Sequence, residues 1–385
     1  MPLPSKTEIP FHRAYITDDE INGVVDAIRS GWITMGPKTV EFERKFRDHV
    51  CRDAPPPDQW HAVSFNSATA ALHLALKAIG LKAGDEVVLP TNTFIATAEV
   101  VTYFGAIPVL CDIEEDTHNL DVLSLTSKIT DRTRAIIPVH FGGQPCDMDE
   151  IIALARQHGL KVIEDAAHAL PSRYKGRLIG TIGDITCFSF YATKTLATGE
   201  GGMAITLNED YARKMRINRL HGISRDAWDR YTMKGSWYYE VVDNGNKYNM
   251  TDMNAALGLA QLAKLDWMSA RRASVARRYD AAFGGTSVIT PVVRPDRDSS
   301  WHLYVIKVGN RNEVIDRLKQ AGIGTSVHFI PVHKHPYYRD TYGYRNDDYP
   351  AANRVFDRSV SLPIYPGLTD DQVDYILEHT LRHAQ

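Results

Sequence analysis

The sequence predicts an α/β fold: a mostly parallel central sheet flanked by helices, followed by a smaller α+β unit. Short β-branched runs alternate with helical patterns from about residue 60 to residue 207, and this pattern changes after Gly284. The composition is globular, with 385 residues of which 44% are hydrophobic and 24% charged. We expect an N-terminal segment and a large domain over residues 1–250. Connecting helices and a small domain are expected over residues 251–385.

The large domain is predicted to alternate strands with helices. Segments such as 69–79 and 148–158 carry apolar residues at helical spacing between the strand-like runs. Alternation of this kind is typical of parallel sheets, in which functional residues gather at the carboxyl ends of the strands. The predicted strands are 86–90, 107–113, 135–141, 161–165, 186–190 and 202–207.

The second half of the chain is predicted to begin irregularly. Residues 208–250 are rich in Arg, Tyr, Trp and Gly and show no clear period, so we expect a long irregular excursion there. A helix should follow the cap Thr251 and continue, with a break, to Phe283. The last unit is predicted to contain strands at 303–308 and 325–329, a helix at 313–320 and a closing helix after Thr369.

Charge and cysteine usage exclude several functions. The net charge is −3, and Lys and Arg form no polybasic block, so we expect no nucleic-acid partner. The four cysteines are widely separated without a Cys-x-x-Cys pair, which indicates neither a zinc knuckle nor a disulfide framework. No apolar run has the length of a signal peptide core or a bilayer span. These observations favour a cytoplasmic protein that does not bind a membrane.

Lys194 lies in the stretch SFYATKTLATGEGGM, between an aromatic run and a glycine cluster. Asp165 ends the predicted strand 161–165. Amino-group transfer is usually carried out with pyridoxal phosphate, which needs a covalent lysine, an acidic partner for the ring nitrogen and a phosphate site. Partial burial beside a cationic ring would make Lys194 nucleophilic, and the Asp165 carboxylate could keep the ring nitrogen protonated. Taken singly, Lys194 could be a solvated lysine and Asp165 a helix cap.

A candidate phosphate site lies at the predicted strand-to-helix junction at Ser67, Ala68 and Thr69. Their N–H groups and hydroxyls can face an anion at the positive end of the helix, although an ordinary cap would look the same. Ser189 offers a further hydroxyl. Phe94 follows the strand 86–90 and could stack on a flat cofactor, with core packing as the alternative.

Together these residues resemble the DegT/StrS-type sugar aminotransferase family of fold-type-I pyridoxal phosphate enzymes. The resemblance extends over nearly the whole chain, and its motifs occur in the order typical of that family. They are Lys194 and residues 30–37, 67–69, 84–87, 164–168, 174–177, 189–190, 199–202, 248–249, 251–252, 362–363 and 365–367.

The resemblance implies a role for each matching residue. Lys194 would form the Schiff base with pyridoxal 5'-phosphate, Asp165 would pair with the pyridine nitrogen, and His168 would contact the phenolic oxygen. Phe94 would stack on the ring. Asn249 would reach the phosphate of the neighbouring subunit's cofactor, which implies a homodimer with shared active sites. The phosphate ligands within the subunit would be Ser67, Ala68, Thr69 and Ser189.

Substrate contacts are expected from two segments. Tyr191 stands where some family members have histidine, and residues 327–338 include His328, His333 and His335. Three histidines invite a metal site, but no acidic ligand is near them, so we expect a substrate loop with His328 and His333 as contacts and no metal. This loop resembles that of members which aminate C4 of a 4-keto-6-deoxy sugar nucleotide.

The resemblance therefore predicts a nucleotide-sugar aminotransferase that uses L-glutamate as amino donor in amino-sugar and polysaccharide biosynthesis. A pyridoxal phosphate sugar deoxygenase or dehydratase is one alternative, although such relatives carry histidine in place of Lys194. A non-catalytic regulatory member of the family is another. Intact Lys194, Asp165 and the phosphate site count against it.

Overall fold

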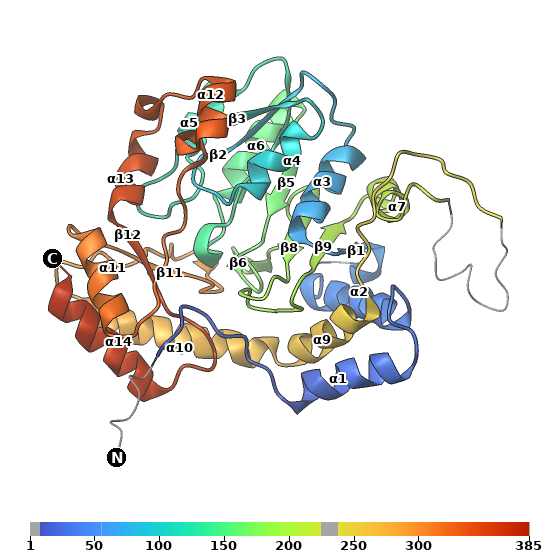
Figure 1. Cartoon of the computed structure of the whole chain (residues 1–385). Helices are drawn as coiled ribbons and strands as arrows, with labels where there is room; N and C mark the ends of the chain where they lie inside the picture. Colours follow the sequence, from blue (N-terminus) through green and yellow to red (C-terminus); the bar gives the residue numbers. More distant parts are fainter. Residues whose placement is uncertain (1–7, 55, 225–237, 385) are drawn as a thin grey trace.

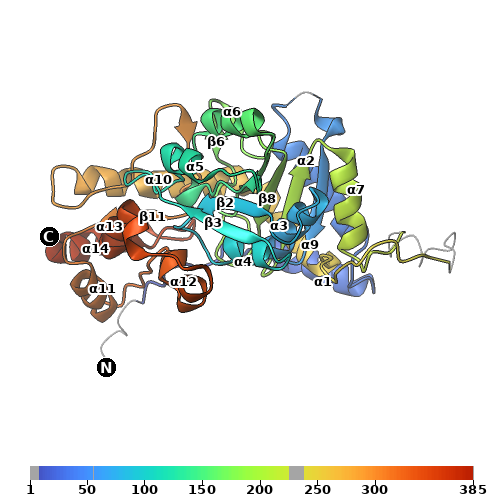
Figure 2. The same ribbon diagram turned by 90° about the horizontal axis from the view of Figure 1, so that it is seen from above.

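The computed structural model describes residues 8–54, 56–224 and 238–384, and a seven-stranded sheet lies at the centre of this described part (Figures 1 and 2). The strand order is β1-β9-β8-β5-β4-β2-β3. Only β9 is antiparallel to its neighbours within the sheet, so the predicted mostly parallel sheet is confirmed. Its strands are β1 (His61–Phe65), β2 (Glu86–Pro90), β3 (Ile107–Cys111), β4 (Thr133–Ile136), β5 (Lys161–Asp165), β8 (Ile185–Ser189) and β9 (Gly202–Thr206).

Both faces of the central sheet are buried. Along β2, Val87 and Leu89 point into one hydrophobic cluster while Val88 points into the other, as the alternation of side chains along a strand requires. All three side chains are fully buried. A sheet covered on both faces leaves only the ends of its strands for a binding site.

Helices form the two outer layers of this unit (Figure 2). Helices α3 (Ala68–Ala78), α4 (Ala96–Thr102) and α7 (Glu209–Asn218) pack into the cluster on one face. The other face is covered by α2 (Pro37–Val50), α5 (Val122–Lys128), α6 (Met148–His158) and α9 (Asp252–Ala263). Helix α1 (Asp18–Arg29) packs outside, against α9. In the described ranges no helix is both long and apolar enough to cross a membrane.

Local sequence signals explain several helix ends. The hydroxyl oxygen of Ser67 accepts a hydrogen bond from the N–H of Ala70 and so caps α3. The predicted cap Thr251 is confirmed at the start of α9, where its hydroxyl accepts from the N–H of Asn254. The predicted break is confirmed too, because α9 ends at Ala263 and α10 covers Leu265–Phe283.

The C-terminal part of the chain has a hydrophobic cluster of its own around an antiparallel strand pair. Ile9, from the N-terminal end of the described chain, packs into this cluster. The division at residues 250 and 251 stays a prediction. The remaining helices and strands are α11 (Arg311–Gln320), α12 (Pro336–Tyr342), α13 (Pro350–Arg358), α14 (Asp370–His383), β11 (Tyr304–Lys307), β12 (Ser359–Leu362) and the short sheet of β6 (Arg173–Tyr174), β7 (Arg177–Leu178) and β10 (Arg297–Asp298).

Several sequence predictions were wrong in detail. Helix α7 lies within the expected irregular excursion at 208–250; half of its residues are charged, and this weakened the helical pattern. Residues 325–329 form no strand, since only Ser326 makes an isolated bridge, to Ser361, and β12 is the strand that pairs with β11. The strand expected at 135–141 is β4, which ends at Ile136.

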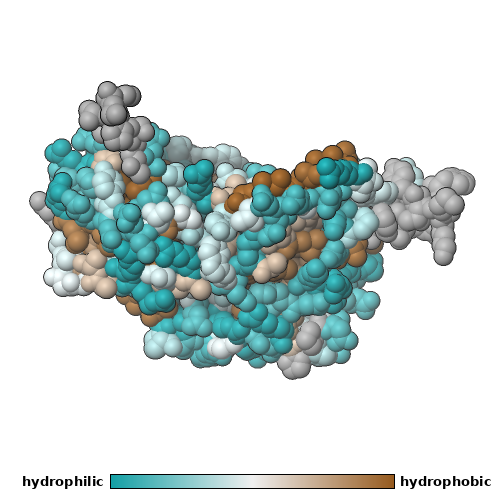
Figure 3. All heavy atoms as spheres, turned by 90° about the horizontal axis from the view of Figure 1, so that it is seen from below, coloured by the Kyte–Doolittle hydropathy of each residue, from teal (hydrophilic) through white to brown (hydrophobic). Residues whose placement is uncertain are grey.

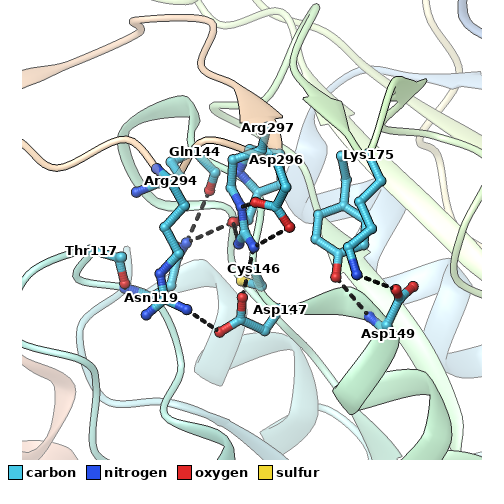
Figure 4. Close-up of polar contacts among 12 residues, drawn as sticks. Thr117, Asn119, Gln144, Cys146, Asp147, Asp149, Lys175, Arg294, Asp296 and Arg297 are labelled. Carbon is cyan, nitrogen blue, oxygen red and sulfur yellow. Dashed lines mark hydrogen bonds and ion pairs between the residues drawn. The ribbon is translucent and has the colours of Figure 1, made fainter.

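The segment between α10 and β11 is held against the large sheet by ion pairs and hydrogen bonds (Figure 4). Asp147 pairs with Arg297 at 2.8 Å and with Arg294 at 3.0 Å. The N–H of Arg294 donates to the side-chain oxygen of Gln144, and Arg297 also donates to the carbonyl of Pro145. We call these five residues the Arg297 cluster. It fixes the path by which the chain reaches Ser300 and then His302, which lines the cavity described next.

Candidate active site

A cavity of about 560 Å³ lies at the carboxyl ends of β5 and β8 and at the start of α3. This is the place at which a parallel sheet is expected to bind its ligand. The cavity brings together most of the side chains predicted from the sequence. The predicted residues that line it are Ser67, Ala68, Thr69, Phe94, Asp165, His168, Ser189, Tyr191, Lys194 and His328.

Lys194 lies on a tight turn after β8. The N–H of Lys194 donates to the carbonyl of Tyr191 at 2.8 Å and closes the turn. On the other side, the hydroxyl of Thr195 donates to the carbonyl of Leu170 at 2.6 Å. Burial lowers the pKa of Lys194 from 10.5 to about 8, although the nearby Asp165 opposes this shift. The amine is therefore partly uncharged near neutral pH, as a nucleophile must be.

Asp165 is the last residue of β5, and its two carboxylate oxygens have different partners. One accepts from the hydroxyl of Thr97 at 2.8 Å, and the other from the N–H of Ala167 at 3.1 Å. Burial raises the pKa of Asp165, and these two hydrogen bonds and Lys194 oppose the rise. No helix begins directly after Asp165, so the carboxylate is not a helix cap. A protonated ring nitrogen in the cavity would supply the positive charge that this buried carboxylate lacks.

His168 has a defined tautomer. Its Nδ1 accepts from the N–H of Gly142 at 3.3 Å, so the ring proton is on Nε2. Burial, together with Lys194 and His328, holds the pKa of His168 well below 6.5. The ring is therefore a neutral donor, suited to a phenolate oxygen.

The candidate phosphate site is the first turn of α3. The N–H groups of Ala68 and Thr69 lie in that turn, where no helix carbonyl is available to them. A Cβ at Gly202 would come within 2.4 Å of the Ser67 carbonyl, so β9 can approach this turn only with glycine there. Ser189, at the end of β8, also lines the cavity. Donors without helix partners at the positive end of a helix fit a phosphate group.

Phe94 is 59% exposed, so it does not pack in the core. Its ring lies 5.9 Å from the ring of Phe329, and Phe329 lies 5.9 Å from His168 in a stacked orientation. These rings form an aromatic wall that suits an aromatic cofactor.

Two predicted residues lie outside the cavity lining. His333 was predicted as a substrate contact, but it is buried, and its two ring nitrogens bond to Thr91 and Asn353. The structure therefore does not bring His333 to the lining of this cavity. Asn249 is buried beside the segment that holds Asn66, whose N–H donates to the carbonyl of Tyr248. Within the described residues, no group of three or more His, Cys, Asp or Glu side chains is arranged to hold a metal ion.

Several residues of the cavity were missed from the sequence. Thr97 lies soon after the predicted strand 86–90, and its spacing of one helical turn from Thr93 was the available signal. No local signal marked the others, because they come from the N-terminal segment and from loops near β11 and β12. The missed residues include Phe11, His12, Thr97, His302 and Phe329.

The residues of the cavity fit pyridoxal phosphate. A buried carboxylate, a lysine of lowered pKa, a neutral imidazole donor and a helix start match its ring nitrogen, aldehyde, phenolic oxygen and phosphate in chemical kind. These groups come from the end of β5 and the segment directly after it, from the turn after β8 and from the start of α3, all at one end of the sheet. The fit depends on the donor set rather than on any single residue.

Comparisons with known proteins agree with this assignment. The sequence pattern of the DegT/DnrJ/EryC1/StrS aminotransferase family matches residues 14–381. The spore coat polysaccharide biosynthesis protein SpsC of Bacillus subtilis is 50% identical over 378 residues, which cover 96% of this chain and 95% of SpsC.

Solved structures give the same result. Spr1654 of Streptococcus pneumoniae in its PMP form has a TM-score of 0.90 and 37% identity, covering 97% of this chain and 98% of that one. Its PLP form is similar, with a TM-score of 0.90 and 36% identity over the same shares. The sugar aminotransferase CalS13 of Micromonospora echinospora has a TM-score of 0.86 and 30% identity, covering 97% and 99% of the two chains. The chain belongs to the DegT/DnrJ/EryC1/StrS family and is a pyridoxal-phosphate-dependent sugar aminotransferase of fold type I.

Proposed function

We propose that this family member converts a 4-keto-6-deoxy sugar nucleotide to the amino-sugar nucleotide, aminating C4 with L-glutamate as amino donor. The observation that carries the proposal is Lys194, with its lowered pKa, in the same cavity wall as the buried carboxylate of Asp165. Bound pyridoxal phosphate supplies an electron sink for the carbon from which a proton is removed.

Lys194 is proposed to bind the cofactor covalently and then to move protons. Once the amino donor has displaced it, the free amine would take the proton from the donor's α-carbon and later deliver a proton to the sugar carbon. A pKa of about 8 suits both directions near neutral pH, because the amine can accept and return a proton without a large free-energy cost.

Asp165 and His168 are proposed to hold the two polar edges of the ring. Thr97 and the N–H of Ala167 orient the Asp165 carboxylate, so that it can keep the pyridine nitrogen protonated. The Nε2–H of His168 would donate to the phenolic oxygen. Phe94 would cover one face of the ring and exclude water from it.

The phosphate is proposed to bind at the start of α3. The groups that would hold it come from the loop before α3 and from the end of β8, and Asn249 of a second subunit would add an amide donor. A fixed phosphate keeps the ring aligned with Lys194 when the covalent bond to the lysine is broken. The proposed ligands within the subunit are Ser67, Ala68, Thr69 and Ser189.

The sugar is proposed to bind between Tyr191 and His328. Both residues line the cavity, and Tyr191 is 47% exposed. His328 has Nδ1 at 2.8 Å from the hydroxyl of Ser361, so its other nitrogen is available to a ligand hydroxyl or carbonyl. The preference for C4 comes from the resemblance of residues 327–338 to the loop of C4-aminating members.

We further propose a homodimer with shared active sites in the cytoplasm. Ile21 and Ile28 of α1 are each 53% exposed, and hydrophobic residues gather on the side of the molecule where α1 lies (Figure 3). A second subunit would bury this surface. All four cysteines are free and buried, which supports a reducing compartment.

The reaction is tested with purified protein and pyridoxal phosphate. L-Glutamate should convert the visible absorption of the lysine-bound cofactor to that of the amino form, with one 2-oxoglutarate released per site. A 4-keto-6-deoxy sugar nucleotide should then restore the first spectrum and yield an amino sugar, whose aminated carbon is read by NMR. Release of a deoxygenated sugar without stoichiometric keto acid would instead establish the deoxygenase. No spectral change with any amino donor would favour a regulatory role.

Shared active sites are tested with hybrid dimers of Lys194→Ala and Asn249→Ala subunits. If Asn249 serves the partner's site, one site of each hybrid contains both lesions and the other contains neither, so activity returns. If each subunit is self-sufficient, both sites keep one lesion and the hybrid stays as inactive as its parents.

A further inference from the structure

The N-terminal segment, residues 8–15, connects the C-terminal part of the chain to the turn that holds Lys194. Its first residues lie beside residues 322–324, where Ile9 forms a parallel bridge with Ile323. The N–H of Ile9 donates to the carbonyl of Gly322 at 2.9 Å, and the N–H of Gly324 donates back to the carbonyl of Ile9 at 2.8 Å. The segment then runs to the start of α1 (Figure 1). We call residues 8–15 the N-terminal strap.

Gly324 permits this close approach. A Cβ at position 324 would come within 2.6 Å of the backbone nitrogen of Phe11, a distance that real side chains do not reach. Because the obstructing atom is backbone, no rotation of a side chain can relieve the contact. The strap therefore lies where it does only because residue 324 is glycine.

The strap is also fixed at its other end. The amide of Gln261 in α9 donates to the carbonyl of Tyr15 at 2.8 Å, and the rings of Tyr15 and Trp267 lie 4.9 Å apart. Between these two anchors, Phe11 and His12 line the cavity, and Phe11 lies 5.4 Å from the ring of His328. The position of His12 is thus set from both sides.

His12 makes the contact with the lysine turn. Its Nε2 is 3.0 Å from the carbonyl oxygen of Ala192, and since a carbonyl only accepts, Nε2 carries the proton. Burial is the main reason that the pKa of His12 is lowered to about 4, so the ring is neutral at physiological pH and its Nε2–H stays in place.

The Ala192 carbonyl takes no part in the hydrogen bond that closes the turn. The turn runs from Tyr191 to Lys194 and is closed by the bond between its two end residues. The peptide between Ala192 and Thr193 is the middle one, and a middle peptide takes no part in the closing bond of a turn. A donor from outside the turn therefore decides how firmly it is oriented.

We propose that His12 is a positioning residue, which holds the Ala192 carbonyl and thereby keeps the amine of Lys194 aimed into the cavity. The inference rests on the role proposed for Lys194. A side chain that must leave the cofactor and return to it gains from a fixed backbone, because small displacements of reacting groups are costly.

The main test is a pair of substitutions at His12 in the holoenzyme. His12→Phe keeps a ring without a donor, and His12→Gln keeps an N–H donor of similar reach. We expect His12→Phe to lower the single-turnover rate with L-glutamate about 10-fold while the apparent donor affinity changes less than about 3-fold. His12→Gln should recover most of the rate.

Hydrogen exchange gives a readout that does not depend on turnover. In His12→Phe, peptides that cover residues 190–196 should exchange faster than in the wild type, whereas peptides from β5 should not change. In His12→Gln the protection should return. A wild-type rate and unchanged exchange in His12→Phe would overturn the proposal. So would a loss confined to donor affinity, which would make His12 a substrate contact.

Gly324 offers a second route to the same effect. Gly324→Ala should displace the strap, reproduce the His12→Phe rate and exchange pattern, and add little to it in the double variant. Full additivity would show that the two residues act separately and would contradict the inference. This variant also keeps the test open if His12→Phe does not fold.

The proposed function can fail separately. If wild-type enzyme shows no spectral change with L-glutamate but reacts with another amino acid, the proposed donor is wrong, and the His12 variants are compared with that donor. If Lys194→Ala keeps the wild-type spectrum and rate, the role of Lys194 fails, and the inference fails with it.

Discussion

Two polar clusters lie near the same cavity, and they differ in how many of their hydrogen-bonding groups remain available to a ligand. In the Arg297 cluster, Asp147 faces two arginines, and Gln144 and the carbonyl of Pro145 accept from these same arginines. Around Lys194, the amine forms no ion pair with a carboxylate of the described residues, although Asp165 is near enough to act on its pKa. His168 keeps its Nε2–H, and the first turn of α3 keeps its N–H groups. The comparison shows that unused bonding capacity in a cavity, more than density of charge, marks the reactive site.

The two clusters also depend on each other. The Arg297 cluster holds the segment that leads to Ser300, whose hydroxyl donates to the carbonyl of His168 at 2.5 Å. The N–H of Ser300 also donates to the hydroxyl oxygen of Ser172 at 3.1 Å. The Arg297 cluster, whose polar groups are paired, therefore supports the residues around Lys194, which keep groups available to a ligand. Substitutions in the first cluster should lower the stability of the protein, and substitutions in the second should lower the reaction rate.

Lys194→Ala should have the largest effect, because it removes both the covalent attachment and the proton carrier. We expect turnover to fall by about 10³-fold or more. Steady-state rates with an amino donor and a keto-sugar nucleotide measure this change. The matched control is Lys307→Met, which removes another buried lysine of lowered pKa that bonds to the carbonyl of Glu115 outside the cavity. Loss of turnover in that control would contradict the assignment.

Asp165→Asn should cause the second-largest loss of turnover. The substitution keeps the size of the side chain but removes the charge that would hold the ring nitrogen protonated, and we expect kcat to fall about 10²-fold. The cofactor should still bind, because the phosphate site is untouched. Single-turnover absorption measurements give both quantities, and an unchanged kcat would remove Asp165 from the reaction.

Arg297→Met should lower the stability of the protein and leave the reaction rate nearly unchanged. It takes one of two arginines from Asp147 and one of two donors from the Pro145 carbonyl, which keeps only the amide of Asn119. We therefore expect the free energy of unfolding to fall by about 2 kcal/mol. The rate at temperatures where the protein is folded should stay within about 3-fold of wild type. Denaturant titration and kinetics on one preparation test this, and a rate loss without a stability loss would place Arg297 in the chemistry.

The smallest expected effect is a shift in a pH profile. The pKa of Lys194 is lowered to about 8, so the uncharged fraction of the amine grows as pH rises through that value. Incorporation of pyridoxal phosphate into cofactor-free enzyme should accelerate over the same range. In Asp165→Asn the midpoint should move lower, because the carboxylate opposes the shift in the wild type. A midpoint near 10.5 would show that Lys194 is solvated.

Much of the site could be predicted from short motifs, because each motif places a functional residue at or just after the end of a strand. Lys194 and Asp165 follow or end predicted strands, and the parallel sheet brings those ends together. The position of His333 outside the cavity lining could not be predicted, because a histidine in a loop gives no sign of whether its ring will be buried against Thr91 or face a ligand.

The sequence by itself determined the parallel sheet, the helix caps and the chemical inventory of the site, since hydrophobic period, capping residues and motif spacing act over a few neighbouring residues. Only the tertiary structure decided which residues complete the cavity. His12 meets Ala192 across 180 residues of sequence, and Gly324 is required by the backbone of a segment more than 300 residues earlier. Such contacts depend on how distant segments pack, and no local pattern of amino acids encodes them.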